Sequence, residues 1–481
     1  MPTKRTIIAS LFWKYCERLG TQLTQFVVSI VLARILAPDD FGVVALAMIF
    51  VSIANIFVQS GLNTALIQKK ETTFLDFSSV FWASLGVSFV AYAVFYAAAP
   101  YIADFYGKEA LSPVIRVLAL SLPIGVPYSI QYAYVVKNMM FRSLFYRSLG
   151  AMIPSGIAGI VAAVQGAGVW AIVIQQLSIS VLNIFIMWFL VPWRPSLEFS
   201  LQRLKALFSF GWKLLCSSLL DTLYSNLRGL IIGKVFSPAD LAYYNRGDHF
   251  PNLVVNNIDN SIQSVMLPSL SAYQDDRPMM KKLMRRSIVT SSFLIIPMMA
   301  GLAMLAKPLI IFLLGEKWLP CVPFVQIYCF IYAFRPIHTS NLSAINAMGR
   351  SDIFLKLEII KKIFGLVFLF GGLAIFRSPL GIAYGAVLST ISCIFINAHP
   401  NKKMLGYGYF EQLKDIMPSF ALSAFMGACL YLFSLIDLHI YLSAAIQIVL
   451  GIVLYFGMAK LLHFECLDYL IETIKGFRHG R

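Results

Sequence analysis

Long apolar runs with few charges follow one another along almost the whole chain. Of the 481 residues, 59% are apolar and 13% are charged. A run of about 20 apolar residues crosses the roughly 30 Å hydrocarbon core as an α-helix, whereas barrel strands would alternate over about ten residues. The pattern predicts an all-α polytopic membrane protein with about 14 transmembrane helices. The expected spans are 9–36, 41–66, 78–101, 111–136, 145–166, 168–190, 207–235, 241–270, 287–314, 319–347, 354–376, 379–398, 416–435 and 439–462.

An internal repeat divides the chain into two halves. The segment ILAPDDFG at 35–42 returns as VFSPADLA at 235–242, and three shorter matches keep the same order. These matches are the WK pairs at Trp13 and Trp212, YGKEAL at 106–111 with LGEKWL at 314–319, and NMMFR at 138–142 with NAMGR at 346–350. The offset stays between 199 and 208 residues throughout. Repeated halves in a membrane chain are typical of transporters with a central pathway between two lobes.

The repeat predicts three parts of the chain. Residues 1–200 are expected to form an N-terminal lobe of spans 1–6, and residues 201–400 a C-terminal lobe of spans 7–12, related by a parallel pseudo-two-fold axis. Residues 401–481 add spans 13 and 14 and a cytoplasmic tail. This last pair has almost no interior charge and no partner in the repeat, so we expect it outside the two-lobed core.

The basic residues predict the orientation in the membrane. Most of the 39 lysines and arginines lie in the tails and in alternate loops, which places both termini in the cytoplasm. The net charge of +16 is therefore chiefly an orientation signal, helped by attraction to anionic lipid, and predicts no nucleic-acid partner. We expect no cleaved signal peptide, because Lys14, Glu17 and Arg18 interrupt the first apolar run.

The sequence predicts neither an enzyme nor a cofactor site. The predicted outer loops have only about two to ten residues, and neither a P-loop nor a G-x-S-x-G motif is found. Asp39 and Asp40 follow Pro38 in a predicted outer turn, which is the preferred interpretation of this acidic pair. The seven cysteines lack C-x-x-C spacing and lie mostly inside predicted helices. We therefore expect no catalytic residue, no metal and no disulfide framework.

The eighth predicted span carries a continuous polar face. At 100° per residue, seven of its polar residues fall within about 140° of arc. They are Arg246, His249, Asn252, Asn256, Asp259, Asn260 and Gln263. Removing all of these groups from water would be costly, which favours a hydrated cavity lining. The alternative is a buried polar seam between packed helices.

Other spans add candidates for the same cavity. The first and seventh spans, which are equivalent in the repeat, each carry a polar stripe, and acidic neighbours on these helices offer a structural alternative for the arginines. The further cavity candidates are Arg18, Gln22, Gln25, Asn55, Gln59, Asp221, Arg228, Arg335 and His338. The tyrosines considered for stacking on sugar rings, or for plain packing, are Tyr128, Tyr132, Tyr328 and Tyr332.

The chain resembles the Wzx-type polysaccharide-repeat flippases, within the multidrug/oligosaccharidyl-lipid/polysaccharide (MOP) exporter superfamily. The resemblance rests on LARILAPDDFGVVALA after the first span, the span count, the GKEAL and N-x-M-x-R repeats and the cytoplasmic ends, and covers about residues 5–465. It implies two six-helix lobes around a V-shaped cavity. It also implies a cargo, an oligosaccharide on undecaprenyl pyrophosphate, flipped to the outer leaflet of a bacterial inner membrane. The partners it implies are this lipid-linked oligosaccharide, membrane lipids, and polysaccharide polymerase and export proteins.

Two other classes stay open on the sequence alone. A small-molecule or cation antiporter of the same superfamily would use Asp221 or Asp259 to bind a cation, although 14 rather than 12 spans argue against it. A non-transporting scaffold of a polysaccharide-synthesis complex would bury its polar faces between helices. The sequence names neither the sugar repeat nor a coupling ion.

Overall fold

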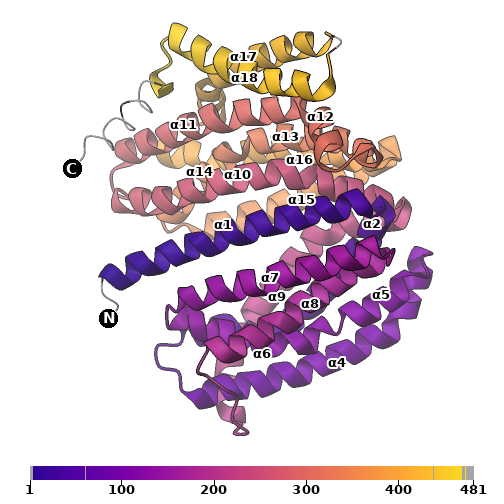
Figure 1. Ribbon diagram of the computed structural model, residues 1–481. Coiled ribbons are helices and arrows are strands. Elements are labelled where there is room, and N and C mark those ends of the chain that lie inside the picture. The colour runs from indigo at the N-terminus through magenta and orange to yellow at the C-terminus, as the bar shows by residue number, and fades with distance from the viewer. Residues whose placement is uncertain (1–3, 60, 437, 468–471, 473–481) are drawn as a thin grey trace. The chain divides into compact units, whose positions relative to one another are not determined.

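The described part of the protein is helical in the computed structural model (Figure 1). The structure describes residues 4–59, 61–436, 438–467 and 472, with side chains described from Phe12 onward. Within these ranges it contains no strand. The all-α class is therefore confirmed, while most of the predicted C-terminal tail lies outside the described residues.

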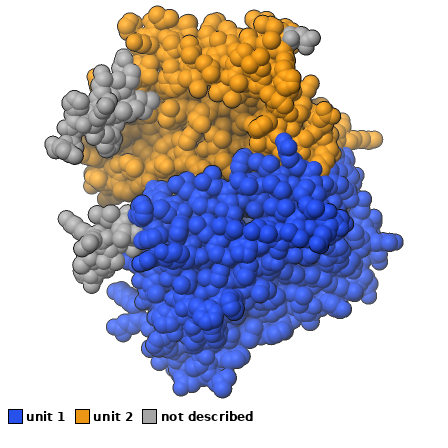
Figure 2. Space-filling view, in the orientation of Figure 1, with its two compact units in different colours: residues 1–242 blue, residues 243–481 orange. Residues whose placement is uncertain are grey.

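The chain divides into two compact units, unit 1 at residues 1–242 and unit 2 at residues 243–481 (Figure 2). The boundary falls inside α10 (Pro238–Ala272), after its first turn. Unit 1 includes α9 (Leu201–Val235), which packs on α2, α3 and α4 although the repeat assigns it to the second half. The three-part division by sequence thus differs from the division by compactness, and it stays a prediction.

In the described residues, unit 1 is built from nine helices and the first residues of α10. The extensive contacts are those of α7 with α8 and with α1, of α4 with α6, and of α2 with α9. The helices that precede α9 are α1 (Lys4–Ile35), α2 (Pro38–Gln59), α3 (Leu62–Gln68), α4 (Phe74–Tyr106), α5 (Leu111–Leu118), α6 (Ser121–Lys137), α7 (Phe141–Val164) and α8 (Val169–Leu190).

Two turns with the same capping geometry begin α2 and α10. The carboxylate of Asp40 accepts a hydrogen bond of 3.2 Å from the backbone N–H three residues earlier, and Asp240 accepts the equivalent bond from Ser237 at 3.1 Å. Each helix starts with proline, which lacks an N–H and is preset for the first helical turn. A Cβ on Gly42 would lie 1.8 Å from the carbonyl oxygen of Pro238. The two turns are therefore neighbours, and glycine is the residue that permits their contact.

Unit 2 continues with α11, which is central to its packing. This helix contacts α13, α14 and α17, while α15 and α16 form a close pair in which a Cβ on Gly372 would lie 2.2 Å from the carbonyl oxygen of Gly381. The elements after α10 are α11 (Arg277–Met304), α12 (Ala306–Leu313), η1 (Glu316–Cys321), α13 (Val322–Ala333), α14 (Arg335–Ala347), α15 (Ser351–Phe376), α16 (Pro379–Leu405), α17 (Tyr409–Ser434) and α18 (Ile440–Leu461).

The final helix pair, α17 and α18, packs on α11 through an apolar cluster centred on Phe293. Phe293 is fully buried and lies 5.1 Å, centre to centre, from the ring of Tyr455. The Tyr455 hydroxyl donates to the backbone carbonyl of Phe293 at 2.8 Å, so this buried polar group is satisfied. The pair is thus held to unit 2 by both burial and a hydrogen bond.

Eleven helical segments in the described chain are long and apolar enough to cross a membrane. Together they identify a multi-pass membrane protein. Three further long helices, α1, α9 and α10, have 32, 35 and 35 residues but lack an equally apolar stretch with few charges. They correspond to the first, seventh and eighth predicted spans, whose polar faces the sequence analysis singled out. The total of 14 spans accordingly stays a prediction.

Candidate functional site: a polar face on α10

The polar face of α10 contacts the end of α13 through a carboxylate. Asp248 accepts a hydrogen bond of 2.8 Å from the Tyr332 hydroxyl and one of 3.3 Å from the amide of Asn252, one helical turn further on. Asn252 in turn accepts a hydrogen bond from the amide of Asn256. Residues three or four apart share a helix face, so Asp248, Asn252 and Asn256 form a row of linked polar groups on α10.

Asp259 provides a second contact, to the start of α14. It accepts hydrogen bonds of 3.2 Å from Arg335 Nε and 3.2 Å from the amide of Gln263. The Asp259 side chain is 4% exposed, whereas that of Arg335 is 43% exposed. A guanidinium carries five N–H donors, and one of them is used in this contact. Arg335 is therefore oriented by a buried carboxylate while much of its side chain is accessible.

Arg246 and His249 lie at the N-terminal end of the same face. The guanidinium carbon of Arg246 is 5.4 Å from the centre of the Trp318 ring, within the range of a cation–π interaction. Trp318 is fully buried in η1, and His249 is half-buried. Asn260, near the other end of the face, is exposed and donates to the backbone carbonyl of Asn256 at 2.6 Å.

His338 belongs to a different polar set, which joins α14, α16 and α17. Its Nδ1 atom is 3.1 Å from the amide nitrogen of Asn397 on α16. Asn341, one turn further along α14, donates to Gln412 at 2.7 Å and accepts from Asn401 at 2.7 Å. These three amides have no exposed surface. A buried row of paired amides is typical of a seam that fixes helix packing, so the structure places His338 beside such a seam.

The predicted cavity residues of unit 1 are mostly accessible. Several are exposed, namely Gln25 on α1, Asn55 and Gln59 on α2, and Asp221 on α9. The half-buried ones are Arg18, Gln22 and Arg228. Exposure alone does not single out the polar stripe of α1, because apolar residues such as Leu23 and Val27 on this helix are exposed as well.

A polar cluster around Arg147 on α7 was not predicted. Arg147 is 11% exposed; it donates to Glu17 of α1 at 3.4 Å and to Asn183 of α8 at 3.3 Å, and its guanidinium carbon lies 4.9 Å from the Tyr128 ring centre. Glu17 also accepts from Ser148 at 2.8 Å. Glu17 thus neutralises Arg147, and Tyr128 stacks on a cation. The available signal was an arginine just inside the fifth predicted span.

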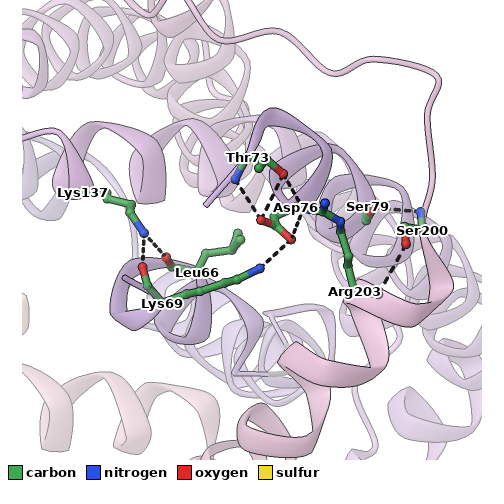
Figure 3. Close-up of polar contacts among 8 residues, drawn as sticks. All are labelled: Leu66, Lys69, Thr73, Asp76, Ser79, Lys137, Ser200 and Arg203. Carbon is green, nitrogen blue, oxygen red and sulfur yellow. Dashed lines mark hydrogen bonds and ion pairs between the residues drawn. The ribbon is translucent and has the colours of Figure 1, made fainter. Parts of the chain in front are cut away.

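A second unpredicted cluster surrounds Asp76 at the start of α4 (Figure 3). Asp76 has no exposed surface, yet it accepts hydrogen bonds from Lys69 at 2.9 Å, from Arg203 at 3.3 Å and from the backbone and hydroxyl of Thr73 at 2.9 and 3.2 Å. Nearby, Lys137 donates to the carbonyl oxygens of Lys69 and, at 3.0 Å, of Leu66. The cluster ties the α3–α4 connection to α6 and α9.

These helices define a multispanning membrane protein. The family of polysaccharide biosynthesis proteins matches residues 31–323, and the chain belongs to it.

The predicted resemblance to Wzx-type flippases is confirmed by three curated relatives. WzxC of Escherichia coli, a lipopolysaccharide biosynthesis protein, is 23% identical over 82% of this chain and 80% of its own. TuaB of Bacillus subtilis, a teichuronic acid biosynthesis protein, is 25% identical over 83% of each chain. ExoT of Rhizobium meliloti, a succinoglycan biosynthesis transport protein, is 26% identical over 65% of this chain. This match covers 64% of the length of ExoT, just under two thirds.

Solved structures show the same fold. The lipid II flippase MurJ in an inward closed conformation superposes with a TM-score of 0.74 over 95% of this chain and 99% of its own, at 16% identity. An inward-facing multidrug resistance MATE transporter of the MOP superfamily gives a TM-score of 0.58 over 80% and 95% of the two chains, at 17% identity. At these identities the likeness concerns the fold alone.

Proposed function

We propose that this protein flips a polyprenyl-pyrophosphate-linked oligosaccharide repeat unit from the inner to the outer leaflet of a bacterial inner membrane, by alternating access. The product would supply O-antigen, capsule or exopolysaccharide synthesis. The observation that carries the proposal is the row of linked polar groups on α10, in a chain of the polysaccharide biosynthesis family. The names of the curated relatives, all from polysaccharide synthesis, support the cargo class.

The chemistry of α10 suits a sugar head and a diphosphate. Sugar hydroxyls that leave water need replacement donors and acceptors, which Asn252 and Asn256 can supply. A diphosphate needs cationic donors, and Arg335 keeps N–H groups on an accessible side chain. Tyr332 adds an aromatic face beside Asp248. The polyprenyl tail would remain in the lipid throughout.

The same proposal includes the transmembrane topology. Adding α1, α9 and α10 to the eleven apolar segments gives the 14 spans expected from sequence, with both termini in the cytoplasm and a parallel repeat. The equivalent turns that begin α2 and α10 support this arrangement, because they share a capping geometry and touch at Gly42. Turns that touch lie on one side of the membrane, as a parallel repeat requires.

An antiporter that binds its coupling ion at Asp259 is less well supported. Arg335 already neutralises this carboxylate within 3.2 Å, so a cation would have to displace a guanidinium. Asp221 on α9 is exposed and stays the other acidic candidate.

The decisive experiment is to deplete the protein and identify the lipid-linked saccharide that accumulates. We expect an undecaprenyl-pyrophosphate-linked repeat unit to build up in the inner leaflet, while surface polysaccharide falls. Complementation with the intact gene is the control. Unchanged polysaccharide export, with no accumulated lipid-linked saccharide, would overturn the proposal.

A labelling experiment separates a transport cavity from a scaffold. The seven native cysteines are replaced, and Asn256→Cys is treated with a polar maleimide in membranes. A hydrated face predicts rapid labelling, whereas Ala344→Cys on α14, a fully buried position, should stay unlabelled. An unlabelled Asn256→Cys would favour the buried seam of a scaffold.

A further inference from the structure

Unit 2 contains a basic cavity away from the polar face of α10. Its volume is about 790 Å³, and it is lined by the first half of α11, the start of α17 and residues 462–466 after α18. These elements come together at the end of unit 2 where lysines and arginines gather, which the positive-inside rule assigns to the cytoplasmic side.

The segment after α18 forms one wall of this cavity. His463 adopts a left-handed conformation, with φ of 51°, and the N–H of Phe464 then bonds back to the carbonyl of Ala459 at 3.0 Å. This reversal brings Leu467 into the buried cluster around Phe293. A non-glycine residue with positive φ is uncommon and costs conformational energy, so the wall is held by its surroundings.

The cavity carries an excess of positive charge. Arg285 forms two hydrogen bonds with Asp415, at 2.7 and 2.9 Å, and the Tyr407 hydroxyl donates to the same carboxylate at 2.7 Å. Burial, together with this hydrogen bond, raises the pKa of Tyr407, so its hydroxyl stays a neutral donor. Lys282 and Lys414 also line the cavity, and neither forms an ion pair with any residue in the described ranges. With Arg286, which also lines the cavity, four cations face the two carboxylates of Asp415 and Glu465, which leaves a net charge of +2.

The lining also has an apolar side. Val289 of α11, Pro418 of α17, Leu462 and Phe464 face the same cavity as the two lysines. A site that combines cations with apolar walls matches an amphiphile with an anionic head, whereas a soluble anion would use the cations alone. The inner leaflet carries such amphiphiles at high local concentration.

We propose that this cavity binds the phosphate headgroup of an anionic glycerophospholipid of the inner leaflet. Lys282 and Lys414 hold the phosphate, and the apolar wall lies along the first part of an acyl chain. Arg285 and Asp415 fix the distance between α11 and α17, which sets the width of the site. The site is separate from the cargo face and does not depend on the identity of the cargo.

The test measures lipid binding to the purified full-length protein in detergent, by thermal unfolding and native mass spectrometry. Phosphatidylglycerol should raise the unfolding temperature and remain bound, while phosphatidylcholine and inorganic phosphate should do neither. The double variant Lys282→Gln/Lys414→Gln removes both cations and should weaken phosphatidylglycerol binding roughly thirtyfold. Both lysines are exposed, so the folded state should persist.

The matched control is Lys402→Gln/Lys403→Gln, which removes the same charge from exposed positions of α16 that do not line the cavity. It should bind phosphatidylglycerol like the unaltered protein. Equal loss in both double variants would show a general charge effect and overturn the site. Full retention of phosphatidylglycerol binding in the cavity variant would also overturn it. Stabilisation by inorganic phosphate alone would show that the ligand is a free anion and not a lipid.

Discussion

Asp76 and Asp259 are both buried carboxylates paired with arginine, but their surroundings differ. Asp76 receives two cations and two donors from Thr73, so its acceptor capacity is met by the protein. Asp259 receives one arginine and one amide. The two arginines are similarly exposed, 43% for Arg335 and 39% for Arg203, so the difference lies in how many donors hold each carboxylate. Arg203 donates to both Thr73 and Asp76, which closes that cluster, whereas Arg335 uses one N–H toward Asp259 and has other N–H groups for a further partner. The comparison separates a structural ion cluster from a candidate transport site.

The largest effect is expected from Asp76→Ala. Removing this carboxylate leaves Lys69, Arg203 and the Thr73 N–H without their buried acceptor, at a cost of about 2–4 kcal/mol in unfolding free energy. We expect membrane abundance and thermal stability to fall, and export to fall with abundance. Normal abundance in an immunoblot of membranes would show that the closed cluster is dispensable.

Arg335→Gln, unlike Asp76→Ala, should lower export without lowering membrane abundance. The proposed contact between this guanidinium and a diphosphate is worth about 2 kcal/mol, or roughly thirtyfold in affinity. Export measured per molecule should therefore drop while abundance stays near normal. Lys403→Gln, at an exposed cation outside both the α10 face and the basic cavity, is the control. Loss of abundance in Arg335→Gln would instead place the Asp259 pair among structural clusters.

Asn256→Leu should give a smaller defect of the same kind. It removes the amide that donates to Asn252, which in turn donates to Asp248. The loss of one such hydrogen bond to the cargo corresponds to about 1 kcal/mol, or several-fold in cargo affinity. Polysaccharide export at matched abundance is the measurement. A fully active variant would limit the transport role to the carboxylate and arginine groups.

The smallest effect is expected from Asp259→Asn. The asparagine oxygen can still accept from Arg335 Nε, and the guanidinium can regain water, so export should change by about twofold or less. Abolished export at normal abundance would contradict this partner role and indicate that the carboxylate carries the coupling charge.

Sequence periodicity predicted the helical fold and the α10 face, because both depend on the spacing of residues along one helix. The clusters around Arg147 and Asp76 escaped prediction, because each depends on an ion-pair partner that lies far away in sequence. Glu17 and Arg147 are 130 positions apart, and Arg203 is 127 positions from Asp76. His338 was predicted for the cavity by its spacing from Arg335, whereas the structure shows its contact with Asn397. Tertiary packing decides which helix a polar residue faces, and the spacing of residues along one helix does not predict it.

The connection between α8 and α9, residues 191–200, bears on how the chain assembles during synthesis. The hydroxyls of Ser78 and Ser79 accept from the backbone N–H groups of Ser196 and Ser200, both at 3.0 Å, and the Trp82 indole donates to the carbonyl of Ser196 at 2.7 Å. These α4 residues leave the ribosome more than a hundred positions before the connection does. The residues of α4 that hold the connection before α9 have therefore already been synthesised when α9 emerges. A gene divided after α9 would consequently encode one product that holds α9 together with its partners α2, α3 and α4.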